Sequence, residues 1–382
     1  MLSFFFKKIN FLSNVLICIK NLFIISTKDI KIAFYSESRN YQKFALPIIK
    51  IILKSSSNSI CYISSDKTDR IENSKVENFY IGDGIIRNIF FLIIKTNNFF
   101  LTLTDLDNHF LKKTKNVKKY IYYFHSPMST FKIYTSSAFD NYDIILCNGK
   151  YQKKEIEFRE TFTKKKKNLV EYGYPYFDYL KKALNDKDSE ISNEILVAPS
   201  WNLNEKNFIS EKIIHLIDRL VELNTYKIRF RPHPEHFKRS KHLLDMIKNK
   251  FSEKNFVFDG EPQPFDSLRK AKYLITDTSG IALEYLLIFR KPVIYYKVKD
   301  KIHNKKIDFF GEFTAIEDII KSKFGLTLDI DNLGNIDEKI KNFNKKFKNI
   351  EGEISSFLSD NFYNIDGNEE VLKKKINQFI DI

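Results

Sequence analysis

The segment KIRFRPHPEH, residues 227–236, places an arginine and a histidine on either side of one proline, with a second proline directly after. Proline biases the preceding residue toward extended geometry, so Arg231 and His233 are both kept out of a helix. Side chains two positions apart in an extended chain point to the same side, which leaves Ile228 and Phe230 facing a core on the other. A cation and a titratable ring at the end of a buried strand indicate a site for an anion.

A second polar turn separates the apolar run YLIT from the helix-like run IALEYLLIF, within residues 273–289. The turn consists of Asp277, Thr278, Ser279 and Gly280. Free N–H groups at a helix start, with small hydroxyl side chains and a glycine, can cradle a phosphate. Glu284, one turn further on, could reach a ribose hydroxyl. The same residue types also cap helices, so this stretch alone leaves both roles open.

A histidine, His125, follows the apolar run YIYYF at the turn FHSPMS. An imidazole suits general-base chemistry near neutral pH. A lone histidine is more often structural, but the carboxyl end of a strand is a favourable position for a functional one. Gly149 and Lys150, after the run DIILC, form a second loop that a ligand could approach closely.

The elements that must position these turns are short apolar runs alternating with helix-like segments. The runs that we interpret as strands lie at 31–36, 59–64, 78–82, 99–103, 120–124 and 143–147, and then at 194–201, 226–231, 255–258, 272–276 and 292–296. Most are continuously apolar, which is typical of strands covered on both faces. The alternating order predicts parallel, doubly wound sheets, whose ligands bind at the carboxyl ends of the strands.

The pattern occurs twice, and 382 residues suffice for two domains. We expect an N-terminal helix over 1–28, one Rossmann-like domain over 29–185, a second over 186–335 and a helical tail over 336–382 that packs back across both. The charged stretch that ends near residue 190 is the expected linker. A cleft between the two domains is the expected ligand site.

The chain is strongly basic, with 63 Lys and Arg against 48 Asp and Glu giving a net charge of +15. Such a charge favours phosphates, nucleic acid or a membrane surface as partners. The aromatic residues lie in apolar runs rather than between surface lysines, so we expect no nucleic acid partner. The cysteines, Cys18, Cys61 and Cys147, match neither a disulfide framework nor a zinc site and suit a reducing cytoplasm.

The N-terminal segment MLSFFFKKINFLSNVLICIKNLFII is apolar but interrupted by lysine and asparagine at helical spacing. It falls short of the roughly 18 uninterrupted apolar residues expected of a membrane-spanning helix. Two interpretations remain: a basic amphipathic helix that lies on an anionic bilayer, or a helix that packs on the first domain.

A metal site is not expected. Asp105 and Asp107 form a D-x-D, the metal-nucleotide signature of a different transferase fold, and we interpret them as part of a structural loop. The sequence has no Cys/His cluster with ligand spacing and no P-loop, so we also expect no cofactor.

Six segments, FHSPMS, AFDNYDIILCNGKYQKKEIE, GYPYFD, LVAPSW, RPHP and TDTSGIALEY, occur in an order that resembles the CDP-glycerol glycerophosphotransferase family. The resemblance extends from about residue 100 to 300. It implies an α/β, GT-B-like fold with an acceptor domain, a nucleotide-donor domain and a central cleft between them. The implied reaction moves glycerol phosphate, or a similar polyol phosphate, from CDP-glycerol to a hydroxyl of a teichoic-acid or capsular polymer and releases CMP.

The resemblance also implies roles for individual residues. His125 would be the base, and the CDP-glycerol site would be lined by Arg231, His233, Asp277, Thr278 and Ser279. Phosphoryl transfer needs an activated hydroxyl, alignment and positive charge where negative charge grows. We therefore expect His125, Arg231 and His233 to be catalytic, and Asp277 to orient the turn or His233.

The expected partners are CDP-glycerol, a lipid-linked or capsular glycan acceptor, and the inner face of an anionic membrane that a cytoplasmic protein binds peripherally. The alternative function is that of a GT-B glycosyltransferase, or a related epimerase, that uses a nucleotide sugar in surface polysaccharide synthesis.

Overall fold

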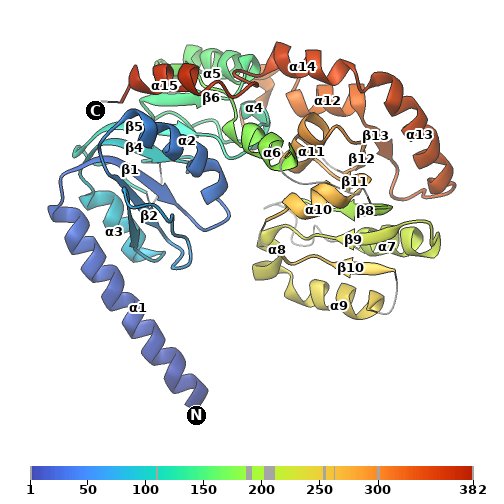
Figure 1. Cartoon of the computed structure of the whole chain (residues 1–382), viewed down its shortest axis with the longest axis horizontal. Helices are drawn as coiled ribbons and strands as arrows, with labels where there is room; N and C mark the ends of the chain where they lie inside the picture. Colours follow the sequence, from blue (N-terminus) through green and yellow to red (C-terminus); the bar gives the residue numbers. More distant parts are fainter. Residues whose placement is uncertain are drawn as a thin grey trace.

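The computed structural model describes residues 2–108, 111–185, 192–201, 211–252, 255–261, 263–298 and 302–380, and the side chains of the first helix from Leu12 onward. Figure 1 shows two α/β lobes side by side and one long helix, α1 (Leu2–Thr27), that projects from the first of them. The expected domain boundary after residue 185 adjoins residues 186–191, which lie outside the described residues.

The N-terminal lobe is built on a seven-stranded parallel sheet with the order β3-β2-β1-β4-β5-β6-β7. The strands are β1 (Ile30–Ser36), β2 (Ile60–Ser64), β3 (Val76–Tyr80), β4 (Thr96–Leu101), β5 (Val117–Tyr123), β6 (Ile144–Cys147) and β7 (Asn168–Glu171). Its helices are α2 (Gln42–Ser55), α3 (Ile85–Ile93), α4 (Thr130–Ile133), α5 (Lys150–Thr163) and α6 (Pro175–Asn185). Ile32 and Phe34 belong to one apolar cluster and Ala33 and Tyr35 to another, so both faces of β1 are covered, which explains its continuously apolar sequence.

The C-terminal lobe repeats this architecture with the strand order β10-β9-β8-β11-β12-β13, also parallel. The strands are β8 (Glu194–Val197), β9 (Lys227–Phe230), β10 (Phe256–Phe258), β11 (Tyr273–Thr276), β12 (Val293–Tyr296) and β13 (Leu326–Leu328). The helices are α7 (Glu211–Glu222), α8 (Pro234–Arg239), α9 (Lys241–Phe251), α10 (Phe265–Lys270), α11 (Gly280–Phe289), η1 (Ile307–Phe310), α12 (Ile316–Phe324), α13 (Ile336–Ile350) and α14 (Glu353–Asn361). The order reverses beside β8, and ligands of such sheets bind at this switch point.

The predicted fold class is confirmed, because two doubly wound parallel sheets face each other. Each predicted strand corresponds to an observed one with shifts of a few residues at its ends. Two further strands, β7 and β13, were not predicted. NLVE follows four lysines, and LTL is only three residues long, so neither carries a clear strand signal.

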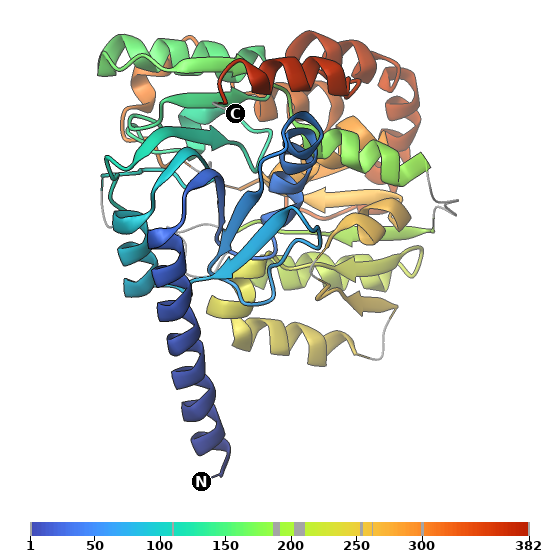
Figure 2. The ribbon, with the colours of Figure 1, turned by 60° about the vertical axis from the view of Figure 1, so that its left-hand side comes forward.

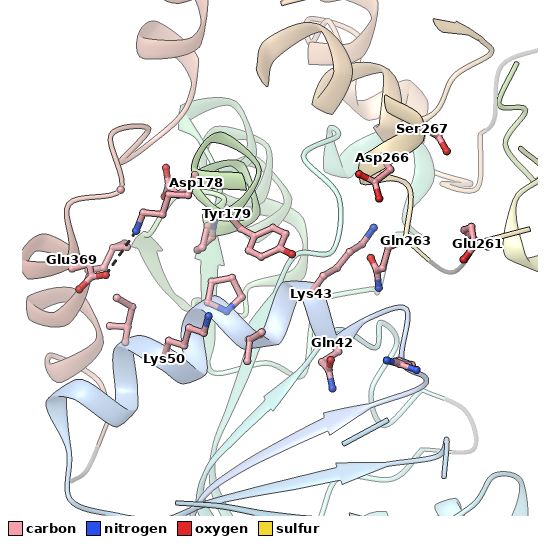
Figure 3. Close-up of a pocket in the computed structure, with 18 residues that line it drawn as sticks. Gln42, Lys43, Lys50, Asp178, Tyr179, Glu261, Gln263, Asp266, Ser267 and Glu369 are labelled. Atoms are coloured by element: carbon pink, nitrogen blue, oxygen red, sulfur yellow. Dashed lines mark ion pairs between the residues drawn. The ribbon is translucent and has the colours of Figure 1, made fainter. Parts of the chain in front are cut away.

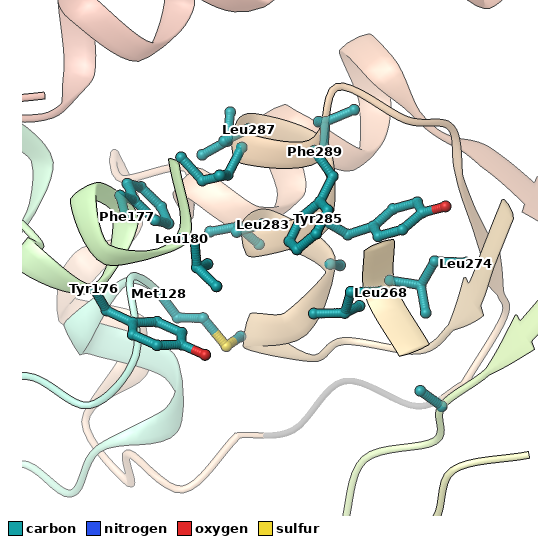
Figure 4. Close-up of a cluster of buried hydrophobic side chains, with 14 of the residues drawn as sticks. Met128, Tyr176, Phe177, Leu180, Leu268, Leu274, Leu283, Tyr285, Leu287 and Phe289 are labelled. Carbon is teal, nitrogen blue, oxygen red and sulfur yellow. The ribbon is translucent and has the colours of Figure 1, made fainter. Parts of the chain in front are cut away.

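An apolar seam joins the lobes. Every residue of α11 from Ala282 to Phe289 is buried. Figure 4 shows Phe177 and Leu180 of α6, together with Met128, facing Leu283 and Leu287 of this helix. The seam therefore holds the start of α11 against the segment that carries His125.

The C-terminal segment returns to the N-terminal lobe. After α14, Phe362 forms an isolated antiparallel bridge with Gly149, and α15 (Glu369–Asn377) then packs on α2. Lys54 of α2 pairs with Glu369 at 2.5 Å. Figure 2 shows α15 above the N-terminal lobe, close to α2.

Helix α1 is only partly packed. Cys18 and Ile25 are buried against the N-terminal lobe, and Asn21 Nδ2 donates to the carbonyl of Tyr80 at 2.8 Å. The opposite side exposes large apolar side chains at helical spacing: Leu12, Leu16, Ile19 and Phe23. Among the described residues, no helix combines the length and the apolar character needed to cross a bilayer.

Candidate active site

Two turns from different lobes meet at one point. A Cβ atom added to Gly280 would lie 2.7 Å from Ser126 Oγ, closer than real Cβ atoms approach. A side chain at position 280 would therefore force either Ser126 Oγ or the His125 turn to move away from the start of α11. The two turns selected from the sequence are brought together across the lobe boundary.

His125 lies in a ring-lined position at the end of β5. Its ring is 5.3 Å from that of Tyr41 and 6.2 Å from that of Phe44. Its Nδ1 is buried and has no hydrogen-bond partner among the described residues. Burial, reinforced by the nearby Lys43 ammonium, lowers the pKa of His125 to about 4. The ring is therefore neutral near pH 7 and can accept a proton.

The segment after His125 is held by carboxylates from both lobes. Glu317 of α12 accepts the N–H of Ser129 at 3.0 Å, and Ser129 Oγ accepts the N–H of Ile316 at 2.8 Å. Glu155 of α5 accepts both the N–H and the hydroxyl of Thr130, at 2.5 and 2.7 Å. Burial raises the pKa of Glu155 to about 8. These bonds fix the backbone of the segment that follows His125.

Arg231 projects from the end of β9 and is held on two sides. Its Nη1 lies 3.0 Å from Asp259 Oδ2, and its Nη2 donates to the carbonyl of Glu261 at 2.7 Å. The positive charge of Arg231 also contributes to lowering the pKa of Lys43, after burial. The guanidinium is therefore preorganised and near enough to Lys43 to influence it across the lobe boundary.

His233 is the N-cap residue of α8, where its Nδ1 accepts the N–H of Glu235 at 3.2 Å. Burial, followed by Glu37 and Glu235, raises the pKa of Tyr41, whose ring touches that of His125. The acidic residue two positions after His233 thus acts on the ring next to His125, and His233 itself is exposed.

Ser279 is the N-cap residue of α11, but its side chain makes no capping hydrogen bond. Its hydroxyl is thus not used for the structural role that the sequence left open. With Gly280 as the first helical residue, the turn keeps the features of a phosphate cradle: small side chains and a helix start. Thr278 lies in the same turn, directly after the buried Asp277.

Asp277 orients the neighbouring strand end. Its carboxylate accepts the hydroxyl of Ser200 at 2.6 Å and the N–H of Ser200 at 3.2 Å. The buried His236 donates from Nε2 to the carbonyl of Ser200 at 3.2 Å. The sequence reasoning missed Ser200 and His236, although both lie in quoted segments, LVAPSW and RPHPEH. The available signal for both residues was a polar side chain shortly after an apolar strand.

Glu284 is directed into the lobe interface. It is 6% exposed and accepts the Tyr174 hydroxyl at 3.4 Å. Burial raises the pKa of Glu284, and the nearby Lys43 opposes this rise. Its expected contact with a ribose stays a prediction, and Lys43 is a residue of this cluster that the sequence reasoning did not select.

The loop at Gly149 has a different role from the one considered from the sequence. An added Cβ there would lie 2.1 Å from the carbonyl oxygen of Asn361. The close approach that glycine permits is thus made by the chain's own C-terminal segment, which bridges to Gly149 through Phe362. A ligand contact at this backbone position is not supported.

The D-x-D residues form part of a turn, with φ of 57° at Asp105 and 65° at Asp107. Asp105 accepts the hydroxyls of Thr135 and Ser137, and Asp107 accepts the N–H of Lys113. In the part of the chain that the structure describes, no group of three or more His, Cys, Asp or Glu side chains is arranged to hold a metal ion.

Comparison with known proteins finds similar folds. The wall teichoic acid polymerase TagF matches with a TM-score of 0.60 at 16% identity, covering 100% of this chain and 97% of that one. UDP-GlcNAc 2-epimerase from Methanocaldococcus jannaschii, in complex with UDP-GlcNAc and UDP, matches with a TM-score of 0.55 at 13% identity, covering 92% and 99%. These likenesses show that the two lobes form a GT-B fold.

A curated relative is the minor teichoic acid biosynthesis protein GgaB of Bacillus subtilis (strain 168). It is 24% identical over 246 residues, which are 58% of this chain. The chain spans only about a quarter of the length of that relative. The model of the family described as CDP-Glycerol:Poly(glycerophosphate) glycerophosphotransferase matches residues 122–356. Because this match takes in more than half of the chain, including His125, Arg231 and the 277–280 turn, the chain belongs to that family.

Proposed function

We propose that this protein transfers glycerol phosphate, or a similar polyol phosphate, from CDP-glycerol to a hydroxyl of a cell-surface polymer and releases CMP. The observation that carries this proposal is the contact between the His125 turn and the start of α11 at Gly280. It places Ser126, the residue after the neutral imidazole of His125, against a helix start of the kind that binds phosphates. Family membership supports the same reaction.

In this mechanism, His125 takes the proton from the acceptor hydroxyl, whose oxygen forms a bond to the β-phosphorus of CDP-glycerol. The bond between that phosphorus and the bridging oxygen breaks, and the electron pair leaves with CMP. Arg231, His233 and the N–H groups of residues 278–280 hold the diphosphate and stabilise the charge on the departing group. The preorganised guanidinium of Arg231 and the rigid His125 segment support the alignment that this step requires.

The test is CMP release from CDP-glycerol by the purified protein in the presence of teichoic-acid or glycan acceptors. His125→Ala and His233→Ala should each lower turnover by about a hundredfold, the scale for a lost acid–base or charge-stabilising group. His242→Ala, which changes an exposed histidine on α9, is the matched control and should retain activity. Release of a nucleotide from nucleotide sugars, with none from CDP-glycerol, would support a glycosyltransferase instead.

The protein is also proposed to bind the inner face of an anionic membrane through α1 and α3. The exposed apolar side chains of α1 are joined by Ile85, Ile89 and Leu92 on α3, which contacts α1. Such a surface on a protein of charge +15 suits an interfacial site with anionic lipids.

Deletion of residues 1–28 is a poor test, because it would also remove the buried Cys18 and Ile25. Leu16→Gln combined with Phe23→Gln leaves those contacts in place. This double variant should lose most co-sedimentation with phosphatidylglycerol vesicles, whereas Phe309→Gln, at an exposed aromatic residue of the C-terminal lobe, should bind as the unaltered protein does. Unchanged binding of the double variant would contradict the proposed surface.

A further inference from the structure

A pocket of about 620 Å³ opens beside the proposed transfer site (Figure 3). Its walls come from α2 and α6 of the N-terminal lobe, from Glu261, Gln263, Asp266 and Ser267 of the C-terminal lobe and from the start of α15. Of the site residues discussed above, Lys43 lines it, and Figure 3 shows the Lys43 side chain directed toward Gln263. The volume is in the range of small-molecule sites.

The pocket is lined by equal numbers of basic and acidic residues. The basic residues that line it are Arg39, Lys43, Lys50 and Lys182. The acidic residues that line it are Asp178, Glu261, Asp266 and Glu369. A groove that follows a chain of phosphates carries an excess of cations, and this balance contrasts with the +15 of the whole protein.

Some of these cations already have carboxylate neighbours. Lys182 Nζ lies 3.9 Å from Glu369 Oε1, the pair drawn in Figure 3. Lys43 lies close enough to Glu284 for each to shift the pKa of the other. The acidic residues that line the pocket offset its cations, so the lining offers no large excess of positive charge to a polyanion. The pocket therefore favours a neutral ligand over a polyanion.

The lining also combines apolar surface with hydrogen-bonding groups. Leu46, Pro47 and Ile51 of α2 form an apolar strip. The ring of Tyr179 is stacked on that of Tyr176, with centroids 5.8 Å apart, and Tyr179 remains 47% exposed. A sugar ring presents both an apolar C–H face and several hydroxyls, so it complements an exposed aromatic ring beside carboxylates and amides.

The carboxyl group of Asp178, one of the acidic residues that line the pocket, packs closely against the loop before α15. A Cβ atom added to Gly367, which has a φ of +59°, would lie 2.7 Å from Asp178 Cγ. The loop before α15 thus packs against this carboxyl, which a bulkier residue would displace. Burial raises the pKa of Asp178 to about 7. Near neutral pH the group can accept a hydroxyl hydrogen bond or, when protonated, donate one.

We propose that this pocket binds a neutral sugar unit. We assign the sugar to the acceptor, because α2, α6 and α15 on the N-terminal side supply most of the pocket wall and no residue of the 277–280 turn lines it. That assignment to the acceptor rests on the proposed function, whereas binding of a sugar to the pocket does not.

The test is saturation-transfer NMR on the full chain with methyl glycosides of glucose, galactose, N-acetylglucosamine and N-acetylgalactosamine. At least one should bind, and Tyr179→Ala should weaken its binding about tenfold or more while leaving the affinity for CMP unchanged. Asp178→Asn should weaken the binding of the same glycoside. Phe309→Ala, at an exposed aromatic residue outside the pocket, is the matched control.

Three results would overturn the assignment: no binding of any glycoside, displacement of the bound glycoside by cytidine, or equal weakening of CMP and glycoside by Tyr179→Ala. Either of the last two results would indicate that the pocket binds the nucleoside instead of a sugar. A nucleotide sugar could also bind more tightly than its glycoside, with this extra affinity lost in Tyr179→Ala. That result would indicate that the sugar belongs to a donor and would overturn its assignment to the acceptor. Glycoside binding without CMP release from CDP-glycerol would contradict the proposed function but would still support the sugar site.

Discussion

Replacing Gly280 by alanine tests the contact on which the proposed site depends. The new Cβ would lie 2.7 Å from Ser126 Oγ, 3.7 Å from Ser126 Cβ and 3.8 Å from Pro127 Cδ. Only the first of these is a clash, so either the hydroxyl or the turn that carries it must move. Inserting a methyl group into a closely packed site costs about 1–3 kcal/mol.

The same substitution favours the helix itself. Alanine is better than glycine within a helix by up to about 1 kcal/mol, so the thermal stability should change little. The cost should instead appear in the alignment of His125 with the phosphate turn. If the whole cost of about 1–3 kcal/mol destabilises the transition state, kcat/KM for CMP release drops about 5- to 150-fold. The signature is thus a loss of rate at nearly constant Tm.

A second substitution identifies the cause. Ser126→Ala removes the clashing oxygen, and the remaining Cβ distance of 3.7 Å is an ordinary contact. In a double-mutant cycle, Gly280→Ala should cost much less in the Ser126→Ala background. Gly352→Ala, at another helix start where a Cβ would meet nothing within 4 Å, is the control. Unchanged kcat/KM in Gly280→Ala, or no coupling with Ser126, would refute the reasoning.

Three further predictions concern ionisable side chains in and around the site. Because the pKa of His125 is lowered to about 4, kcat/KM should fall only below about pH 5. Lys43→Met removes a charge that lowers this pKa, so the fall in kcat/KM should begin at a higher pH, which a pH–rate profile measures. The pKa of Glu155 is about 8 when folded, above its unfolded value, so stability is lost as pH rises between these values; urea midpoints from pH 5 to 8 should decline less in Glu155→Gln than in the unaltered chain. Arg231→Lys cannot keep the contacts with both Asp259 and the carbonyl of Glu261, and KM for CDP-glycerol should rise about tenfold; an unchanged KM would exclude Arg231 from the donor site.

Local sequence patterns predicted the elements well, because buried parallel strands need uninterrupted apolar residues. They also located the turns that carry His125, Arg231 and Asp277, since polar residues directly after such strands must lie at the carboxyl edge of a sheet. The GT-B fold followed from the repetition of this pattern together with the family resemblance.

Contacts between distant segments could not be predicted in the same way. Gly149 resembles a ligand loop in sequence, but the approaching backbone belongs to Asn361, more than two hundred residues later. Lys43 reads as an ordinary helix lysine and becomes part of the site only because α2 faces Glu284 across the lobes. Such roles arise from tertiary packing, which no single segment encodes.

The return of the chain from α14 to α15 has a mechanical consequence. The polypeptide passes between the lobes twice, once after α6 and once before α15, and the second passage is tied to Gly149 and to α2. Two covalent connections restrain the relative movement of the lobes more than a single linker would. The position of the His125 turn relative to the start of α11 would then be better defined than in a protein whose lobes share one linker.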